Sequence, residues 1–300
     1  MKPSGGSELA FKNLYKYVGQ DWVKDTNLVL SFCEPNLIDS NRKNVIWQQL
    51  SYDQFNVQNM NDGDFVNKID HFVYVSNWQL NEFKNRFPIS DAHNTVIRNA
   101  IIPIEFKPKP KGKIKLIYTS MPNRGLEILL DAFELLNRDD VELTVYSSLI
   151  IYGKNYRDDL AQLQLDRAKS MKNVIYKGYA MNAAIRKALQ EHHIFSYPNT
   201  FEETSCMAIM EAGAAGCKIV TTSHGALPET ADKWPTYIQY TDDKKLLASN
   251  YAEVLNETID NYWKEHFDLK EQSDWFNENY SWEVRAPEWR NFLDNVCVKS

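Results

Sequence analysis

The stretch from Phe201 to Glu229, FEETSCMAIMEAGAAGCKIVTTSHGALPE, decides the fold of this chain. It holds two glutamates, Glu203 and Glu211, with seven residues between them, in a run of small and apolar residues typical of a packed helix. A β-type run over Lys218–Thr222 and a turn-rich loop over 224–229 follow. Carboxylates bind hydroxyls, and helix N-termini and tight loops bind phosphates, so this arrangement suits a nucleotide-sugar pocket.

The same alternation of strand and helix patterns extends outward from this stretch, beginning near residue 112. Within 125–137 the apolar residues recur at helical spacing on one face. Strands alternating with helices of this length predict βαβ units and a parallel sheet. The expected strands are Lys113–Thr119, Val141–Ser147, Asn173–Lys177, Ile194–Tyr197, Lys218–Thr222 and Thr236–Gln239. The expected helices are Gly125–Asn137, Arg157–Ser170, Met181–Glu191 and Ser205–Ala215.

The region before residue 105 shows a sparser version of this pattern, and a break separates the two regions. The prolines and lysines of Pro103–Gly112 cannot continue a helix or a central strand, so they predict an interdomain linker. Many large rings lie between Asp274 and Leu293, and so many apolar rings must pack on something. In the first region we expect a helix over Glu8–Tyr17 and strands over Asn27–Phe32, Asn44–Gln48, His71–Ser76 and Thr95–Arg98.

Composition narrows the class of protein. The formal net charge is −6 and 25% of the residues are charged, which predicts no general attraction to nucleic acid or anionic lipid. The four cysteines are scattered without a Cys-x-x-Cys pair, as expected for reduced thiols rather than a disulfide scaffold. The first residues are too polar for a secretory signal, and no apolar run is long enough to span a membrane. We expect a soluble, cytoplasmic protein.

The candidate site residues come first from the opening stretch. Thr204 or Ser205 is expected to cap the following helix, so that the free amides around Thr204–Cys206 face an anion. Glu203 then accepts hydrogen bonds from sugar hydroxyls, and Glu211, two turns into the helix, binds a vicinal diol such as ribose. The plainer interpretation makes both glutamates solvated surface carboxylates. The glycines and the strand that surround the pair favour the functional interpretation.

A second candidate site lies in the segment Tyr118–Leu126, which joins a strand to a helix. Loops at the carboxyl ends of parallel strands bind ligands in open α/β folds, which makes Ser120 and Arg124 donor-binding candidates. Arg124 is suited to pair with a diphosphate and to stabilise a departing nucleotide. Taken alone, an arginine before a glycine is better explained as a solvated loop residue.

The spacing Glu203-x7-Glu211, followed by Ala-Gly-Ala-Ala-Gly, resembles the donor-site signature of retaining glycosyltransferases of the GT4 type. The resemblance implies an α/β protein with the GT-B fold, in which the parallel sheets of two Rossmann-like domains face each other across a cleft. It implies an acceptor-side domain at 1–104, completed by C-terminal helices at about 278–300. A linker at 105–112 and a nucleotide-sugar-binding domain at 113–277 follow from the same comparison.

The resemblance also implies roles for residues whose local pattern is weak. Gly5 and Gly6, before the first helix, resemble the Gly-Gly-x-Glu loop that faces the donor in GT4 proteins, although a flexible tail explains them equally well. Gly178 and Tyr179 correspond to a region near the nucleotide base. The chain departs from the family where relatives carry a histidine after a tryptophan-containing strand, because Gln48 and Gln49 stand at 48–49. Neither amide acts as a base at neutral pH.

The expected activity is transfer of a sugar from a nucleotide diphosphate sugar to an acceptor hydroxyl, with retention of configuration. Glu203 and Arg124 are the expected catalytic residues. No metal or cofactor is expected, since no Asp-x-Asp pair stands in a plausible site, and the partners are the nucleotide sugar and a saccharide or other hydroxyl acceptor, not nucleic acid. A GT-B-like module that binds a nucleotide sugar or glycan without turnover stays open. A dinucleotide dehydrogenase is disfavoured because no strand runs into a G-x-G-x-x-G turn.

Overall fold

The computed structural model describes residues 5–90, 93–150, 158–264 and 268–298. Backbone contacts divide the chain into two compact units. Of the described residues, unit 1 holds 103–201 and 208–277, and unit 2 holds 5–102, 202–207 and 278–298. The short segment 202–207, which carries Glu203, therefore groups with unit 2, whereas the helix that follows it groups with unit 1.

Unit 2 is built on a four-stranded parallel sheet whose strand order follows the chain, β1-β2-β3-β4. The strands are β1 (Thr26–Leu30), β2 (Lys43–Trp47), β3 (His71–Tyr74) and β4 (Asn94–Val96). The helices are α1 (Gly6–Val18), α2 (Gly63–Val66), α3 (Asn77–Lys84) and α11 (Trp282–Val298). Short 3₁₀ helices lie at Asp21–Lys24, Pro35–Leu37 and Phe55–Asn61.

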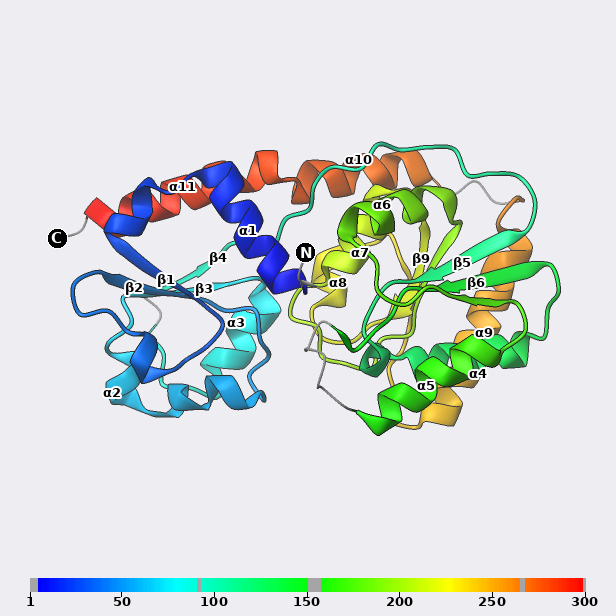
Figure 1. Ribbon diagram of the computed structural model, residues 1–300, viewed down its shortest axis with the longest axis horizontal. Helices are drawn as coiled ribbons and strands as arrows, with labels where there is room; N and C mark the ends of the chain where they lie inside the picture. The colour runs from blue at the N-terminus through cyan, green and yellow to red at the C-terminus, as the bar shows by residue number, and fades with distance from the viewer. Residues whose placement is uncertain (1–4, 91–92, 151–157, 265–267, 299–300) are drawn as a thin grey trace. The chain divides into compact units, whose positions relative to one another are not determined.

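Helices cover both faces of this sheet (Figure 1). Successive residues of a strand point to opposite faces, so Trp47 packs on the side of α1 and α11 while Ile46 packs on the side of α2 and α3. Trp282, Trp289 and Phe292 of α11 belong to the first of these cores. The aromatic rings of α11 thus find their packing partners in unit 2, whereas Trp275 and Phe276 of the preceding helix lie in unit 1.

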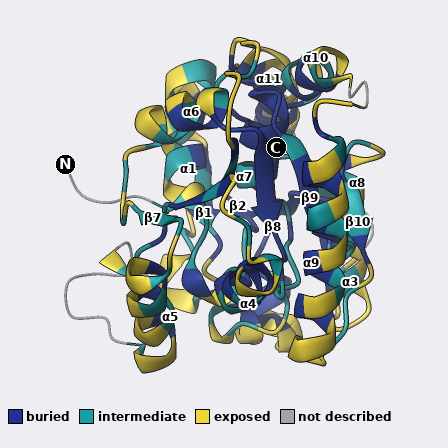
Figure 2. Cartoon of the chain, turned by 90° about the vertical axis from the view of Figure 1, so that its right-hand side faces the viewer, coloured by how far each residue is buried: buried dark blue, intermediate teal, exposed yellow. Residues whose placement is uncertain are grey.

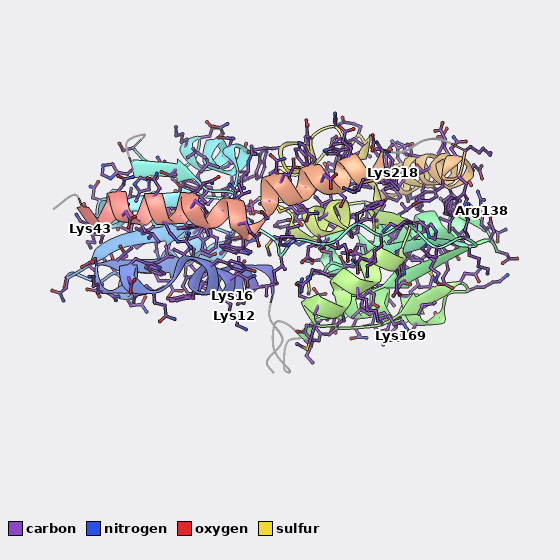
Figure 3. All side chains as sticks on the ribbon, turned by 90° about the horizontal axis from the view of Figure 1, so that it is seen from above. Lys12, Lys16, Lys43, Arg138, Lys169 and Lys218 are labelled. Atoms are coloured by element: carbon purple, nitrogen blue, oxygen red, sulfur yellow. The ribbon has the colours of Figure 1, made fainter. Side chains whose placement is uncertain are left out.

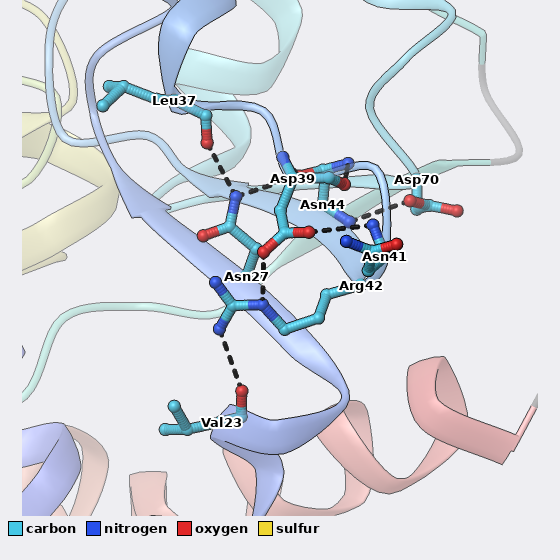
Figure 4. Close-up of polar contacts among 8 residues, drawn as sticks. All are labelled: Val23, Asn27, Leu37, Asp39, Asn41, Arg42, Asn44 and Asp70. Atoms are coloured by element: carbon cyan, nitrogen blue, oxygen red, sulfur yellow. Dashed lines mark hydrogen bonds and ion pairs between the residues drawn. The ribbon is translucent and has the colours of Figure 1, made fainter.

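A polar network ties the connection between β1 and β2 at the amino ends of these strands (Figure 4). The side-chain amide of Asn27 donates to Asn44 Oδ1 at 2.9 Å, and the backbone amide of Asn44 donates to Asp70 Oδ2 at 2.8 Å. Asp39 accepts from the Asn41 backbone amide and from Arg42 Nε, and both contacts lower the pKa of its carboxyl. These contacts lie at the strand ends opposite to those where open α/β folds bind ligands, and they are structural.

Unit 1 contains a six-stranded parallel sheet in the order β10-β9-β8-β5-β6-β7. The central strand β8 is fully buried (Figure 2). Apolar residues throughout such a strand are typical of a parallel sheet covered on both faces. The strands are β5 (Ile114–Tyr118), β6 (Val141–Val145), β7 (Val174–Tyr176), β8 (Ile194–Tyr197), β9 (Lys218–Thr222) and β10 (Thr236–Ile238).

Two groups of helices cover this sheet (Figure 1). On one face α4 packs against α9 and α5, and on the other lie α6, α7 and α10. The helices are α4 (Leu126–Leu136), α5 (Asp159–Ser170), α6 (Asn182–Glu191), α7 (Met207–Ala214), α8 (Leu227–Ala231), α9 (Lys244–Asn261) and α10 (Leu269–Tyr280). A Cβ on Gly213 of α7 would lie 2.2 Å from the Phe276 ring of α10, so a glycine is required where these helices meet.

The linker expected at 105–112 is bound closely to unit 1. The Lys109 ammonium donates to the carbonyl oxygens of Leu189 at 2.9 Å and Ala215 at 2.8 Å, which lie at the C-terminal ends of α6 and α7. Burial lowers the pKa of Lys109, while the carbonyls at two helix C-termini provide the negative potential that favours a cation. The linker is therefore fixed along unit 1 by a buried side chain.

The strands and helices expected from the sequence form, with bounds that differ by a few residues. Arg157, where one helix was expected to begin, lies outside the described residues. One expectation about the opening stretch is wrong. The helix expected at Ser205 begins at Met207, so Thr204 lies too far before it to be its cap, and the Thr204 hydroxyl donates to the Gln49 carbonyl at 3.1 Å.

Candidate functional site

The topology of unit 1 locates a candidate ligand site. From β5 the chain adds β6 and β7 on one side, then returns to add β8, β9 and β10 on the other. The order therefore reverses between β5 and β8. Open α/β sheets bind ligands at the carboxyl ends of the strands that flank such a switch point. The loops that follow β5 and β8 are those that carry the residues singled out in the sequence.

These two loops meet closely. After β5 the chain forms a 3₁₀ helix over Pro122–Arg124, and Gly125 follows with φ of +101°. A Cβ at Gly125 would lie 2.0 Å from the Pro198 carbonyl oxygen in the loop after β8. Both the positive φ and the close approach demand glycine at this position. The Arg-Gly pair is thereby placed against the loop that follows β8.

Arg124 contacts that second loop through its side chain. Its guanidinium lies 3.3 Å from the centroid of the Phe201 ring, a cation–π contact. The backbone of the Phe201 turn is held by Asn199, whose Oδ1 accepts from the Phe201 amide at 3.1 Å. Contact with the ring fixes the plane of the guanidinium, and a planar guanidinium matches the geometry of carboxylates and phosphates. Ser120, also expected at this site, lies half-buried in the same loop as Arg124.

Glu211 lies inside unit 1, in the middle of α7, and is only 7% exposed. Its Oε1 accepts a hydrogen bond from Asn182 Nδ2 at 2.7 Å. Burial raises the pKa of Glu211 from 4.5 to about 7, and the Asn182 hydrogen bond and the charge of Arg186 oppose that shift. The carboxyl therefore titrates near neutral pH, which is common for groups in functional sites.

Asn182 and Arg186 lie one turn apart on α6, and the Arg186 guanidinium donates to Asn182 Oδ1. This pair orients the amide so that its nitrogen faces Glu211. Gly178, with φ of +66°, and Tyr179, which is exposed, precede α6 in the chain. The residues expected near the nucleotide base thus stand just before α6, the helix whose Asn182 donates to Glu211.

Glu203 lies in the irregular segment 202–206 of unit 2 and is half-buried. Its neighbour Thr204 is buried by the contact with Gln49, and Cys206 is buried as well. Ser205 is half-buried. The amides of this segment are not the first turn of a helix, as the sequence predicted, because α7 begins only at Met207.

The glycine pair at the start of α1 lies beside the end of this segment. Gly5 precedes α1, and its carbonyl accepts from the Leu9 amide at 3.1 Å. A Cβ on Gly6 would come within 2.7 Å of the Met207 methyl carbon. Because a methionine end is flexible, this contact favours glycine without requiring it. Within unit 2 the structure therefore brings Gly6 next to the segment that carries Glu203.

Gln48 and Gln49, which replace the expected histidine, are structural. Gln48 is fully buried, and its Oε1 accepts from the Leu50 amide at 2.9 Å. The side-chain amides of Gln49 and Asn99 form a reciprocal pair, with N···O distances of 2.8 and 2.9 Å. Both glutamine side chains are thus occupied in holding the loop after β2.

Five of the basic side chains labelled in Figure 3 have partners within their own units: Lys16, Lys43, Arg138, Lys169 and Lys218. Arg138 donates to Asp140 at 2.7 Å and to Asp260 at 2.5 Å, which raises the pKa of its guanidinium. Lys43 pairs with Asp70 at 3.1 Å. Among the described residues, no three His, Cys, Asp or Glu side chains are grouped so as to hold a metal ion. No helix in the described ranges combines the length and apolarity needed to cross a membrane.

The sequence analysis did not predict the contacts of three residues near the candidate site: Asn182 with Glu211, Phe201 with Arg124, and Tyr52 with Glu202. Asn182 contacts Glu211 across 29 positions of the chain. Tyr52 donates from its hydroxyl to Glu202 Oε2 at 2.6 Å across 150 positions. Contacts at such separations leave no local pattern that could have revealed them.

Comparison with known proteins gives a match to a family model and matches to several individual proteins. Residues 113–257 match the family model of the group 1 glycosyl transferases. One human subunit of phosphatidylinositol N-acetylglucosaminyltransferase is 26% identical over 165 residues, 53% of this chain and 33% of that protein. The GPI3 subunit of the same transferase in Saccharomyces cerevisiae is 23% identical over 250 residues, 78% of this chain and 53% of that protein. The chain thus matches between a third and about half of the length of these curated relatives.

A solved structure agrees with the fold. The crystal structure of Anabaena Alr3699/HepE in complex with UDP and glucose matches with a TM-score of 0.71 at 14% identity, over 96% of this chain and 82% of that one. At this identity the likeness establishes the fold alone, and that fold is GT-B, with two parallel-sheet α/β units. The fold is thus GT-B, and the match to the group 1 glycosyl transferases is carried by residues 113–257.

Proposed function

We propose that this chain is a retaining, GT4-type glycosyltransferase that moves a sugar from a nucleotide diphosphate sugar to an acceptor hydroxyl. One observation carries the proposal most directly. At the switch point of the unit 1 sheet, the loops after β5 and β8 present a ring-stacked arginine, and the helix after β8 presents a buried carboxyl. A cationic group and a carboxyl at this place suit a diphosphate and a sugar hydroxyl respectively.

The donor would be bound by residues of unit 1. Arg124 is suited to pair with the diphosphate through the in-plane donors of its guanidinium, and the Phe201 ring fixes the plane of that group. Glu211 accepts hydrogen bonds from the ribose hydroxyls when it is ionised. Gly178, Tyr179 and Ser120 complete the proposed donor side. Because a neighbour in fold holds UDP and glucose, uridine diphosphate sugars are the first donors to test.

In the proposed reaction the acceptor oxygen forms a bond to the anomeric carbon as the bond from that carbon to the diphosphate oxygen breaks. The departing phosphate oxygen takes the acceptor proton, so no protein base is needed. This fits a chain in which Gln48 and Gln49 stand at the position of the family histidine and are engaged in structural hydrogen bonds. Arg124 stabilises the charge that develops on the diphosphate, and Glu203 positions the sugar.

We further propose that the reaction needs no metal ion, because Arg124 supplies positive potential for the diphosphate. Activity that survives chelation with EDTA supports this, whereas loss of activity with EDTA and recovery with Mg²⁺ or Mn²⁺ contradicts it. A saccharide or another hydroxyl compound is the proposed acceptor. The cytoplasmic location expected from the sequence remains a prediction.

The proposal is tested in two steps. Thermal-shift measurements with UDP, GDP, ADP and their sugars identify the nucleotide, since a ligand that binds only the folded state raises its stability. Transfer and donor hydrolysis are then followed with the stabilising nucleotide sugars and a panel of saccharide acceptors. We expect Arg124→Ala to lower kcat/KM by about 10²–10³, the usual effect of losing one group that stabilises transition-state charge.

The alternative function is a module that binds a nucleotide sugar or a glycan without turnover. Lys107→Ala, in the exposed part of the linker, serves as a matched control for the loss of one positive charge. Binding without turnover by the wild-type chain across the whole panel contradicts the transferase and supports the binding module. Full activity of Arg124→Ala contradicts the role given to that residue.

A further inference from the structure

The segment that carries Glu203 has no helix or strand of its own, yet it is not loosely held. Its neighbours on both sides are bound by side-chain hydrogen bonds within unit 2. The Tyr52 hydroxyl donates to Glu202 Oε2 at 2.6 Å, and the Thr204 hydroxyl donates to the Gln49 carbonyl at 3.1 Å. These contacts flank Glu203 by one residue on each side, so together they restrict the backbone from which its carboxylate extends.

The loop that provides these two contacts, residues 49–52, is itself well fixed. The Gln49 side chain is paired with Asn99, as described above. The amide of Gln79, at the start of α3, donates to the Leu50 carbonyl at 2.8 Å. A loop held by side chains from α3 and from the region after β4 is a suitable anchor for an irregular segment.

The Tyr52 ring is also held on its face. The Arg86 guanidinium lies 3.6 Å from the centroid of this ring, and Arg86 forms an ion pair with Glu82 of α3. The hydrogen bond to Glu202 raises the pKa of Tyr52 to about 12, so the hydroxyl keeps its proton at neutral pH. Tyr52 is thus a fixed donor whose partner is the residue next to Glu203.

We propose that Tyr52 is a positioning residue for Glu203, acting through Glu202. The inference rests on the proposed function, in which Glu203 contacts the sugar of the donor and Arg124 and Glu211 contact the nucleotide. Loss of the Tyr52 hydroxyl then weakens recognition of the sugar and lowers kcat, but leaves recognition of the nucleotide unchanged. A role limited to stability would not separate these two quantities.

The test compares Tyr52→Phe with Tyr74→Phe. Tyr74 lies in the same unit, is fully buried, and its hydroxyl has no hydrogen-bond partner among the described residues, so its loss is a matched control. The dissociation constants of UDP and UDP-glucose are measured for each variant, together with kcat for transfer or donor hydrolysis. If the nucleotide panel selects another base, the corresponding pair replaces these probes.

We expect Tyr52→Phe to weaken UDP-glucose binding about tenfold, as for loss of a hydrogen bond to a charged group, and to leave UDP binding within about twofold. Tyr74→Phe is expected to change neither constant. Glu202→Ala should reproduce Tyr52→Phe, and the double variant should be no weaker than either single variant, because both remove the same contact. Glu202→Gln keeps an oxygen that accepts from Tyr52 and should retain most of the sugar affinity.

Specific outcomes overturn the inference. If Tyr52→Phe equals Tyr74→Phe in an active protein, Tyr52 does not position Glu203, and the proposed function stands. If Tyr52→Phe weakens UDP and UDP-glucose equally and lowers the melting temperature, its role is only structural. If the wild-type chain neither binds nor turns over any nucleotide sugar in the panel, the proposed function fails and this inference fails with it.

Discussion

Glu211 and Glu203 stand eight positions apart in the chain, and the fold places them in opposite environments. Glu211 lies within a helix of unit 1, buried, with a hydrogen bond from Asn182. Glu203 lies in an irregular segment of unit 2, half-buried, with its neighbours bound to Gln49 and Tyr52. The Glu211 carboxyl is held by a hydrogen bond from the neighbouring helix α6, whereas the position of Glu203 depends on the contacts of the backbone on either side of it.

The difference has a physical consequence for each residue. A buried carboxyl pays a desolvation cost when it ionises, so Glu211 affects stability and responds to pH near neutrality. A carboxyl on a loop loses less hydration, but the precision of its position depends on the contacts of that loop. Substitution of Glu203 should therefore affect mainly activity, and substitution of Glu211 should affect mainly the pH dependence of stability.

The largest expected effect is on activity, from Glu203→Ala. Under the proposed function this change removes a group that contacts the sugar, and kcat/KM should fall by about 10²–10³. The free energy of unfolding should change by no more than about 0.5 kcal/mol, because the side chain is partly exposed. Steady-state kinetics and urea unfolding measure the two quantities, with Glu253→Ala on the exposed side of α9 as the control. Equal kinetics for both variants would remove Glu203 from the site.

The second prediction concerns stability and Glu211→Gln. Burial raises the pKa of Glu211 from 4.5 to about 7, so the folded state holds the proton more tightly than the unfolded chain. The stability that follows from this proton is complete below pH 4.5 and is lost as the pH rises through about 7. Glutamine does not ionise, so the variant should exceed the wild type at pH 8 by up to about 3 kcal/mol.

Urea unfolding at several pH values between 4.5 and 8 checks this prediction. The difference between Glu211→Gln and the wild type should disappear at the acid end, where both proteins carry an uncharged side chain. Glu253→Gln, on the exposed side of α9, is the control for the loss of one carboxylate. A stability difference that is constant with pH would mean that burial does not hold the Glu211 proton.

A smaller effect is expected in nucleotide binding. Under the proposed function, ionised Glu211 accepts from ribose hydroxyls better than the protonated form, so UDP affinity should fall about tenfold between pH 8 and pH 6. Glu211→Gln should bind UDP more weakly at pH 8 and should lose this part of the dependence. Calorimetry measures the UDP affinity of both proteins at each pH. The ratio of the two affinities does not contain the protonation of the UDP phosphate, because that is the same in both experiments. Parallel pH profiles in the two proteins would separate Glu211 from the ribose.

The smallest expected effect is that of Asn182→Ala. The Asn182 hydrogen bond lowers the pKa of Glu211, so its removal should raise that pKa and move the midpoint of UDP binding to higher pH. At pH 7.5 we expect a loss of affinity of about threefold, less than for one full hydrogen bond to a charge. Lys187→Ala, on the exposed side of α6, is the control. An unchanged midpoint would show that Asn182 does not tune the carboxyl.

The fold could be predicted to a large extent because its signals are local. β8 and β9 form with the bounds expected from the sequence, since both are rich in apolar and β-branched residues and are followed by turn residues. The start of α7 could not be predicted in the same way. The Thr204 hydroxyl donates to a carbonyl 155 positions away, and a local capping pattern contains no information about that partner.

In the candidate site, too, local features could be predicted and long-range contacts could not. The sequence alone indicated the two parallel-sheet regions, the loops at their strand ends, and the residues Arg124, Glu203 and Glu211, because residue type, glycine positions and spacing are local properties. Only the tertiary structure decided that Glu211 is buried, that Arg124 stacks on Phe201, and that Tyr52 is bonded to Glu202. Desolvation and long-range hydrogen bonds depend on which distant elements pack against a side chain, and that is settled only when the chain folds.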